Sequence, residues 1–340
     1  MKMIETGDQN MNIKKVTLKD IAEATGFSVN TVSHALNDKD DISAETKRIV
    51  HNKARELGYI RNTMAGALRS RKTNTIAVII GDISNPYWGI MVKLIEIYAR
   101  QHQYVSYIIS TEEDPQMEET AVMSALERNV DGIILCPCQK NDNSVKMLKK
   151  LDFPFVLIGR YFDDIPCNYI ASDDRTGGYL ATKHLLDKGH SQVLFLNGPS
   201  YISSARLRLM GYLDALKERG IPYDPRLVKE VSITGDSSYF AGSFSRGQLN
   251  FSAIFAFSDI IAWEAIHTMK KLHLPAFENI EVVGFDNLQS NLLLPYSLTS
   301  VGYNKPKMAQ LAVETLLKAI DGEISSYVKI ILDTELILRS

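Results

Sequence analysis

The sequence lacks the features of several protein classes. It contains no run of about 18 or more apolar residues, so we expect no membrane-spanning helix and no membrane partner. Its first residues have no apolar stretch typical of a secretion signal. Only three cysteines occur in 340 residues, at Cys136, Cys138 and Cys167. A sparse, odd set of cysteines is typical of a reducing compartment, which predicts a cytoplasmic location.

Sequence signatures of catalysis are also missing. No Gly-x-Gly-x-x-Gly, P-loop, His-Glu-x-x-His or Gly-x-Ser-x-Gly pattern occurs. Cys136 and Cys138 are separated by one proline rather than by the two residues of a redox or zinc pair. We therefore expect no enzyme activity, no metal site and no cofactor.

The charge is small overall but unevenly distributed. The net charge is −2, yet residues 13–72 hold 12 Lys and Arg against 7 Asp and Glu. The rest of the chain is therefore acidic. A small basic domain followed by a large acidic one is typical of a nucleic-acid-binding protein with a separate ligand-sensing domain. Proteins that bind no DNA also show this charge distribution.

Residues 18–37 predict a helix-turn-helix. Leu18, Ile21 and Ala22 form one apolar stripe at helical spacing. Gly26 suits a sharp turn, and Ser28 is a candidate N-cap for a second helix. Within that helix we expect Val32, Ala35 and Leu36 to point inward. The side chains expected to point outward are those of Val29, Asn30, Ser33 and His34.

This segment closely resembles the DNA-binding headpiece of the lactose-repressor (LacI/GalR) family. The family pattern runs L-x-D-[IV]-A-x-x-[AS]-G-[VF]-S-x-x-T-V-S-[RH]-x-[LI]-N, against LKDIAEATGFSVNTVSHALN in residues 18–37. The resemblance implies contacts to base edges and phosphates of double-stranded DNA. The implied headpiece contacts are Thr17, Ser28, Val29, Asn30, Thr31, Ser33, His34, Asn37 and Tyr59.

Three of these side chains suit particular bases. Asn30 matches an adenine edge, and Val29 matches a thymine methyl group. His34 stands where relatives carry Arg or His, and it suits a guanine edge as donor or acceptor depending on its tautomer. The alternative for His34 is a surface histidine that contacts phosphate.

Residues 62–72 predict either a flexible linker or a hinge that becomes helical on DNA. The segment is short and weakly apolar, which disfavours an isolated helix. By resemblance to the family's N-x-x-A-x-x-L pattern, paired hinges enter the minor groove. The implied contacts are Asn62, Ala65, Leu68 and Arg69.

From Thr75 onward, apolar strand patterns alternate with helical patterns, which is typical of parallel sheets covered by helices on both faces. The sequence thus predicts a small all-α headpiece followed by an α/β core that resembles the type I periplasmic-binding-protein fold. The predicted parts are a flexible tail (1–14), a headpiece (15–61), a hinge (62–73) and a core (74–340). The core divides into a first subdomain (74–171 and 301–330) and a second (172–300 and 331–340).

A ligand is expected between these subdomains, beyond the carboxyl ends of the strands. Aromatic faces and fixed polar groups at these ends suit a sugar or sugar derivative. The predicted effector contacts are Asn85, Tyr87, Trp88, Arg160, Ser204, Arg208, Ser258 and Asp286. Two alternatives stay open: Trp88 as a core residue, and Arg208 as an ion-pair partner of Asp286 or Asp173.

The sequence as a whole predicts a transcriptional regulator, most simply a repressor of a carbohydrate-utilisation operon whose operator affinity depends on an effector. One headpiece reads only a half-site, so a homodimer on a pseudo-palindromic operator is expected. No heptad tail precedes Ser340, which favours a dimer over a tetramer. The alternative is a soluble sugar-binding or sugar-processing α/β protein with an accessory N-terminal domain.

Overall fold

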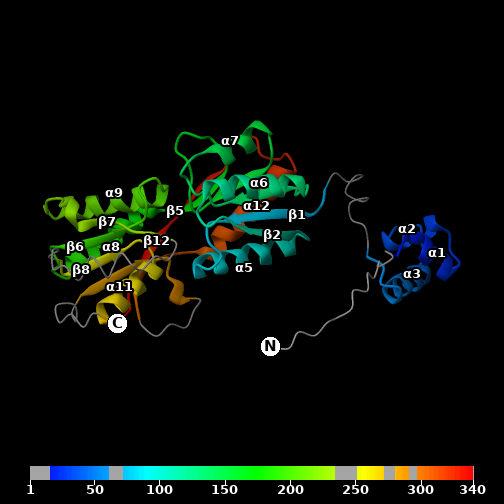
Figure 1. Ribbon diagram of the computed structural model, residues 1–340, viewed down its shortest axis with the longest axis horizontal. Helices are drawn as coiled ribbons and strands as arrows, with labels where there is room; N and C mark the ends of the chain where they lie inside the picture. Colours follow the sequence, from blue (N-terminus) through cyan, green and yellow to red (C-terminus); the bar gives the residue numbers. More distant parts are fainter. Residues whose placement is uncertain (1–15, 61–71, 234–250, 272–279, 291–296, 340) are drawn as a thin grey trace, which may run out of the picture. The chain divides into compact units, whose positions relative to one another are not determined.

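The structure is a computed structural model that describes residues 16–60, 72–233, 251–271, 280–290 and 297–339. The chain divides into two units, residues 1–71 and residues 72–340 (Figure 1). Within the described ranges, no helix is both long and apolar enough to cross a bilayer. The predicted tail (1–14) lies outside these ranges.

Residues 16–60, the described part of the first unit, form three helices around a small apolar core. The helices are α1 (Leu18–Thr25), α2 (Val29–Leu36) and α3 (Ala44–Glu56). Each begins at a hydroxyl side chain that accepts a hydrogen bond from the first turn: Thr17, Ser28 and Ser43. The predicted N-cap Ser28 is thereby confirmed. Gly26 ends α1 with φ of 72°, the left-handed conformation that turns the chain toward α2.

The second unit contains two sheets of six strands each. The first sheet has the order β11-β5-β4-β3-β1-β2, and all of its strands are parallel. Its strands are β1 (Thr75–Ile80), β2 (Val105–Ser110), β3 (Gly132–Leu135), β4 (Phe155–Ile158), β5 (Tyr169–Ser172) and β11 (Lys329–Leu332). We call this sheet and its helices the first lobe.

Helices cover both faces of the first sheet (Figure 1). One face packs against α5 (Pro86–Gln101) and α12 (Lys305–Ile320). The other packs against α6 (Pro115–Glu127) and α7 (Asn143–Lys150). The inner strands β1, β3 and β4 are almost entirely apolar because both of their faces are buried.

The second sheet has the order β12-β10-β9-β8-β6-β7. Its strands are β6 (Val193–Asn197), β7 (Val228–Glu230), β8 (Ala253–Ala256), β9 (Glu281–Phe285), β10 (Thr299–Tyr303) and β12 (Thr334–Ile337). Only the edge pair β10–β12 is antiparallel among these strands. With α8 (Asp174–Asp187), α9 (Ser203–Glu218) and α11 (Asp259–Lys271), this sheet forms the second lobe.

The chain passes between the lobes at three places. It leaves the first sheet after Ser172, returns through α12 after Tyr303, and crosses again between Leu332 and Thr334. The predicted subdomain boundaries need correction at three places. Residues 301–303 were assigned to the first subdomain, but they belong to the second sheet, where β10 pairs with β9 and β12. Ser172 and residues 331–332 were assigned to the second subdomain, but they belong to the first sheet, where β5 pairs with β11.

Candidate functional sites: the recognition helix and the interlobe pocket

The outer face of α2 presents the side chains predicted to read bases. Val29 and Asn30 are exposed at the start of the helix, and 45% of the Val29 surface is accessible to solvent. Ser33 and His34 lie one turn further on and are half-exposed. Val32 and Ala35 face the headpiece core and are fully buried. The helix therefore separates an apolar inner face from a short, polar outer face, as predicted.

Several of the predicted DNA contacts also build the headpiece. Ser28 Oγ accepts from Thr31 N–H at 3.0 Å, which caps α2. Thr17 Oγ1 donates to Asp20 at 2.7 Å within a capping box. Asn37 Nδ2 donates to the Ser33 carbonyl at 2.6 Å. These side chains are held in place before any DNA contact is made.

Of the remaining predicted DNA contacts, the structure describes Tyr59 but not the residues of the hinge. Tyr59 is half-buried and packs against the headpiece core, while its N–H donates to the Ala54 carbonyl at 2.8 Å. The predicted hinge contacts lie outside the described residues: Asn62, Ala65, Leu68 and Arg69.

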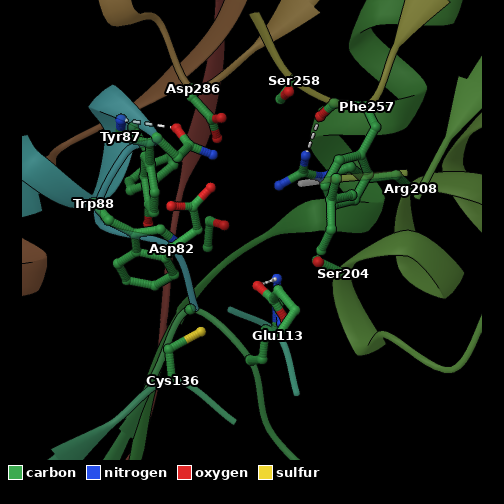
Figure 2. A pocket seen from close by; sticks show the side chains of 16 residues that line it. Asp82, Tyr87, Trp88, Glu113, Cys136, Ser204, Arg208, Phe257, Ser258 and Asp286 are labelled. Atoms are coloured by element: carbon green, nitrogen blue, oxygen red, sulfur yellow. Dashed lines mark hydrogen bonds and ion pairs between the residues drawn. The ribbon is translucent and has the colours of Figure 1, made fainter. Parts of the chain in front are cut away.

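A pocket of about 640 Å³, partly open to solvent, lies at the carboxyl ends of the strands of both lobes (Figure 2). Parallel strands that end at one edge bring the loops after them together, which is why the pocket forms there. All eight predicted effector contacts line it: Asn85, Tyr87, Trp88, Arg160, Ser204, Arg208, Ser258 and Asp286.

Other lining residues were not predicted as contacts. They are Asp82, Glu113, Cys136, Gly159, Ser172, Ile233, Phe257 and Tyr303. Cys136, Gly159 and Phe257 directly follow a strand. Asp82, Glu113 and Ile233 lie two or three residues beyond one, so the rule that predicted the eight applies to these six as well. Tyr303 and Ser172 instead end strands that were not assigned from the sequence, β10 and β5.

Arg208 is the most heavily contacted side chain of the pocket. Its Nε lies 2.8 Å from Asp174 Oδ1, and an Nη donates to the Phe257 carbonyl. The guanidinium also stacks 3.5 Å from the centre of the Phe285 ring. Neither partner considered from the sequence, Asp286 or Asp173, is its ion-pair partner. Asp173 instead caps α8, and Asp174, one position on, points inward.

Arg160 forms a second buried ion pair in the first lobe. Its two Nη atoms lie 2.7 and 2.9 Å from the Glu113 carboxylate, and one also donates to the Pro137 carbonyl at 3.1 Å. Burial opposes its charge, but Glu113 more than compensates and raises the pKa of Arg160. Both pocket arginines are therefore already neutralised by carboxylates.

Aromatic rings supply the apolar part of the pocket. Tyr87 and Trp88 meet edge to face with their centres 4.8 Å apart. Trp88 lines the pocket and is only 5% exposed, so it serves as a core residue as well. Tyr303, at the end of β10, donates its hydroxyl hydrogen to the Tyr87 oxygen at 2.6 Å. This bond joins the two lobes at the pocket.

Asp286 differs from the other carboxylates around the pocket. Its side chain points into the cavity (Figure 2) and makes no hydrogen bond to any residue that the structure describes. Its backbone has φ of 95°, and its N–H donates to the Val301 carbonyl at 2.8 Å. Burial raises the pKa of Asp286, while Arg208 and Lys305 oppose that rise. An acceptor-rich group is thus left available to a ligand.

Comparison with known families finds two matches along the chain. Residues 17–62 match bacterial regulatory proteins of the lacI family. Residues 73–335 match the periplasmic binding proteins and sugar binding domain of the LacI family. Together these regions include the recognition helix and every residue that lines the pocket.

Individual proteins agree with these matches along nearly the whole chain. The HTH-type transcriptional regulator DegA of Bacillus subtilis (strain 168) is 31% identical over 96% of this chain and 97% of its own. A crystal structure of the lac repressor dimer bound to operator and the anti-inducer ONPF covers 96% of this chain and 98% of its own, with 25% identity and a TM-score of 0.79. A complex of the transcriptional regulator CelR with cellobiose covers 96% of this chain and 99% of its own, with 25% identity and a TM-score of 0.70.

Proposed function

This chain belongs to the lacI family of bacterial regulatory proteins, and from that premise we propose that it represses a carbohydrate-utilisation operon under the control of a small effector. The family consists of transcriptional regulators, so the chain is a regulator and not an enzyme. The alternative of a sugar-processing protein with an accessory domain is thereby set aside. The proposed site of action is DNA in the cytoplasm.

One observation carries the effector part of the proposal. All eight residues chosen as effector contacts line a single pocket whose walls come from both lobes. A ligand that touches both walls binds one lobe arrangement better than another, and that difference is what shifts a conformational equilibrium. The operator affinity of the headpieces would then follow the lobe arrangement.

The charges of the pocket support an uncharged effector. Arg160 and Arg208 are both paired with carboxylates, so neither offers a free cation to a phosphate. Asp286 adds an acceptor without a partner among the described residues, and a carboxylate repels anions but accepts from hydroxyls. Tyr87 and Trp88 offer apolar surface to a sugar ring. We therefore expect a neutral sugar rather than a sugar phosphate.

The DNA part of the proposal rests on α2 and on the relatives. The lac repressor structure is a dimer bound to operator, and we propose the same assembly for this chain on a pseudo-palindromic site. The hinge contacts predicted for Asn62, Ala65, Leu68 and Arg69 stay predictions.

A thermal-shift screen tests the effector proposal directly. The full chain is heated with neutral sugars, sugar phosphates and purines, and a true effector raises the melting temperature by mass action. We expect neutral sugars to give the shifts and Asp286→Asn to reduce them. Shifts with purines or phosphates alone would contradict the proposal.

A further inference from the structure

The recognition helix ends beside a carboxylate that contacts its last base-reading residue. His34 Nδ1 lies 2.7 Å from Asp41 Oδ2, in the loop that joins α2 to α3. We propose that Asp41 is a positioning residue: it accepts a hydrogen bond from His34 Nδ1, so that Nε2 is the ring atom that reads a base. This inference rests on the proposed function, in which α2 enters the major groove.

The contact decides which ring nitrogen faces outward. A carboxylate only accepts hydrogen bonds, so the nitrogen that it contacts must carry the hydrogen. Nδ1 is therefore occupied inside the headpiece, and Nε2 is the atom left for DNA. The second partner of a histidine commonly sets the tautomer in this way.

Asp41 is held in place by the loop around it. Ile42, its neighbour, packs against the headpiece core, and its N–H donates to the Lys39 carbonyl at 3.3 Å. Ser43 then caps α3. The chain on one side of Asp41 is thus fixed to the core, and this limits how far the carboxylate can move from the end of α2.

Several other charged groups of the headpiece have partners of their own. On α3, His51 lies 3.5 Å from Asp38, and Lys47 donates to the Asp38 carbonyl at 3.0 Å. On α1, Lys19 lies 4.0 Å from Glu23, and Asp20 belongs to the capping box. Among the described residues, Asp41 is the charged side chain that bonds to His34.

The edge of a base decides what Nε2 can bind. An Nε2 atom that carries a hydrogen donates to the two acceptors of guanine, whereas one without a hydrogen accepts from the amino group of adenine or cytosine. Asp41 contacts Nδ1 and so influences where the ring hydrogen lies, and in this way it affects which base His34 selects.

The position of His34 separates its target from those of the other readers. His34 lies four residues after Asn30, so both side chains share the outer face of α2, one turn apart. Each then meets a different base pair, and a change in the preference of one base can be assigned to His34.

Selection from a pool of random duplexes tests the inference with the full chain. Wild type, His34→Ala, Asp41→Asn and Asp40→Asn are compared, and Asp40→Asn is the matched control because it removes the same charge from the neighbouring position. We expect wild type to enrich a palindrome with a base that His34→Ala no longer selects. Asp41→Asn should lower that base preference by about fivefold, while Asp40→Asn keeps it.

A second measurement reports the ring itself. In the full chain labelled with ¹⁵N-histidine, the His34 signals are assigned by their loss in His34→Gln. We expect neutral His34 to carry its hydrogen on Nδ1, and Asp41→Asn to shift the ring toward the other tautomer.

Two outcomes overturn the inference: an unchanged base preference in Asp41→Asn, or a ring tautomer that is the same in wild type and Asp41→Asn. If wild type enriches no sequence at all, the proposed function itself fails.

Discussion

At the scale of single residues, Arg208 combines two roles in the second lobe. It lines the pocket, and it also neutralises Asp174, which is 1% exposed. Burial raises the pKa of Asp174, and the Arg208 charge opposes that rise. Removing the arginine would therefore leave a carboxylate without compensation in a poorly solvated site.

We expect Arg208→Met to lower the free energy of unfolding by about 3–5 kcal/mol, because breaking a buried ion pair leaves one charge unpaired. Adding Asp174→Asn should recover part of this loss without restoring the response to effector. Arg175→Met, which removes an exposed pair with Asp214, is the control and should change stability little. Urea unfolding measures all four proteins, and a fully stable Arg208→Met protein would contradict the prediction.

Asp259 makes stability depend on pH. Its carboxylate accepts from Ser300 Oγ at 2.6 Å and from Leu288 N–H at 2.7 Å. Burial, together with the nearby Asp286, raises the pKa of Asp259 from 3.8 to about 7. Between these values the folded chain holds a proton that the unfolded chain has lost, so stability falls as the pH rises through this window.

The Asp259→Asn protein should lose this dependence. An asparagine can accept from the Leu288 N–H and donate to Ser300 Oγ, so both contacts survive without a titrating group. We expect the fall in unfolding free energy between about pH 4 and about pH 7, at most about 4 kcal/mol in wild type, to become smaller. Urea unfolding across this range measures it. Asp214→Asn is the control, since Arg175 lowers the pKa of Asp214 below the window.

Residue-scale prediction from the sequence succeeded where position along a strand decides the outcome. Ser258 and Asp286 follow β8 and β9 closely, and residues at those ends converge whatever their neighbours are. The sequence could not identify Asp174 as the ion-pair partner of Arg208, because Asp173 and Asp174 are adjacent. Which of them caps α8 and which faces inward depends on where the helix begins and on what packs against it.

At the scale of elements, α8 and α9 pack with their backbones in close contact at two glycines. A Cβ on Gly211 would lie 2.0 Å from the Arg175 carbonyl oxygen, and one on Gly178 would lie 2.4 Å from the Arg208 carbonyl oxygen. Neither clash can be relieved by rotating a side chain, because both partners are backbone atoms. The absence of side chains here sets the distance between the helices, and with it the position of Arg208.

We expect Gly211→Ala to destabilise the chain by about 1–3 kcal/mol or more, because the two helices must move apart. Gly89→Ala in α5 is the matched control: nothing lies within 4 Å of a Cβ at Gly89. Alanine there should raise stability by about 0.5–1 kcal/mol through its better helix propensity. Thermal and urea unfolding compare the two, and equal effects would show that the helix contact is not tight.

The sequence predicted elements well where local residues set their ends. Helix α5 begins where Asn85 caps it and Pro86 suits its first turn, and both of these signals are local in the sequence. Strand β5 was not assigned. It has four residues, and it exists through pairing with β4 and with β11, which lies far along the chain. Such pairing leaves no local pattern to recognise.

At the scale of the whole core, hydrogen bonds across the pocket hold the two lobes in this arrangement. Tyr303 bonds to Tyr87 at 2.6 Å, and Ser203 N–H donates to Gln139 Oε1 at 2.8 Å. Arg206 and Asp163 add an exposed ion pair at 2.9 Å. Each bond joins a residue of the second lobe to one of the first, so each is lost if the lobes separate or rotate.

Tyr303→Phe removes one of these bonds and keeps the ring in the core. A lost buried hydrogen bond shifts the balance between lobe arrangements by about 1 kcal/mol, or about fivefold. Tyr179→Phe is the control, because its hydroxyl bonds to Glu218 within the second lobe. We expect Tyr303→Phe to change both effector affinity and operator affinity, and Tyr179→Phe to change neither.

The directions of the two changes reveal what the effector does. Effector and operator act on the same lobe equilibrium, so each alters the affinity of the other by an equal factor. If the effector releases DNA, Tyr303→Phe must shift the two affinities in opposite directions; if it is a corepressor, both must shift the same way. Calorimetry with the effector and fluorescence anisotropy with the selected operator measure these shifts. Unchanged affinities in Tyr303→Phe would mean that the bond between the lobes takes no part in the coupling.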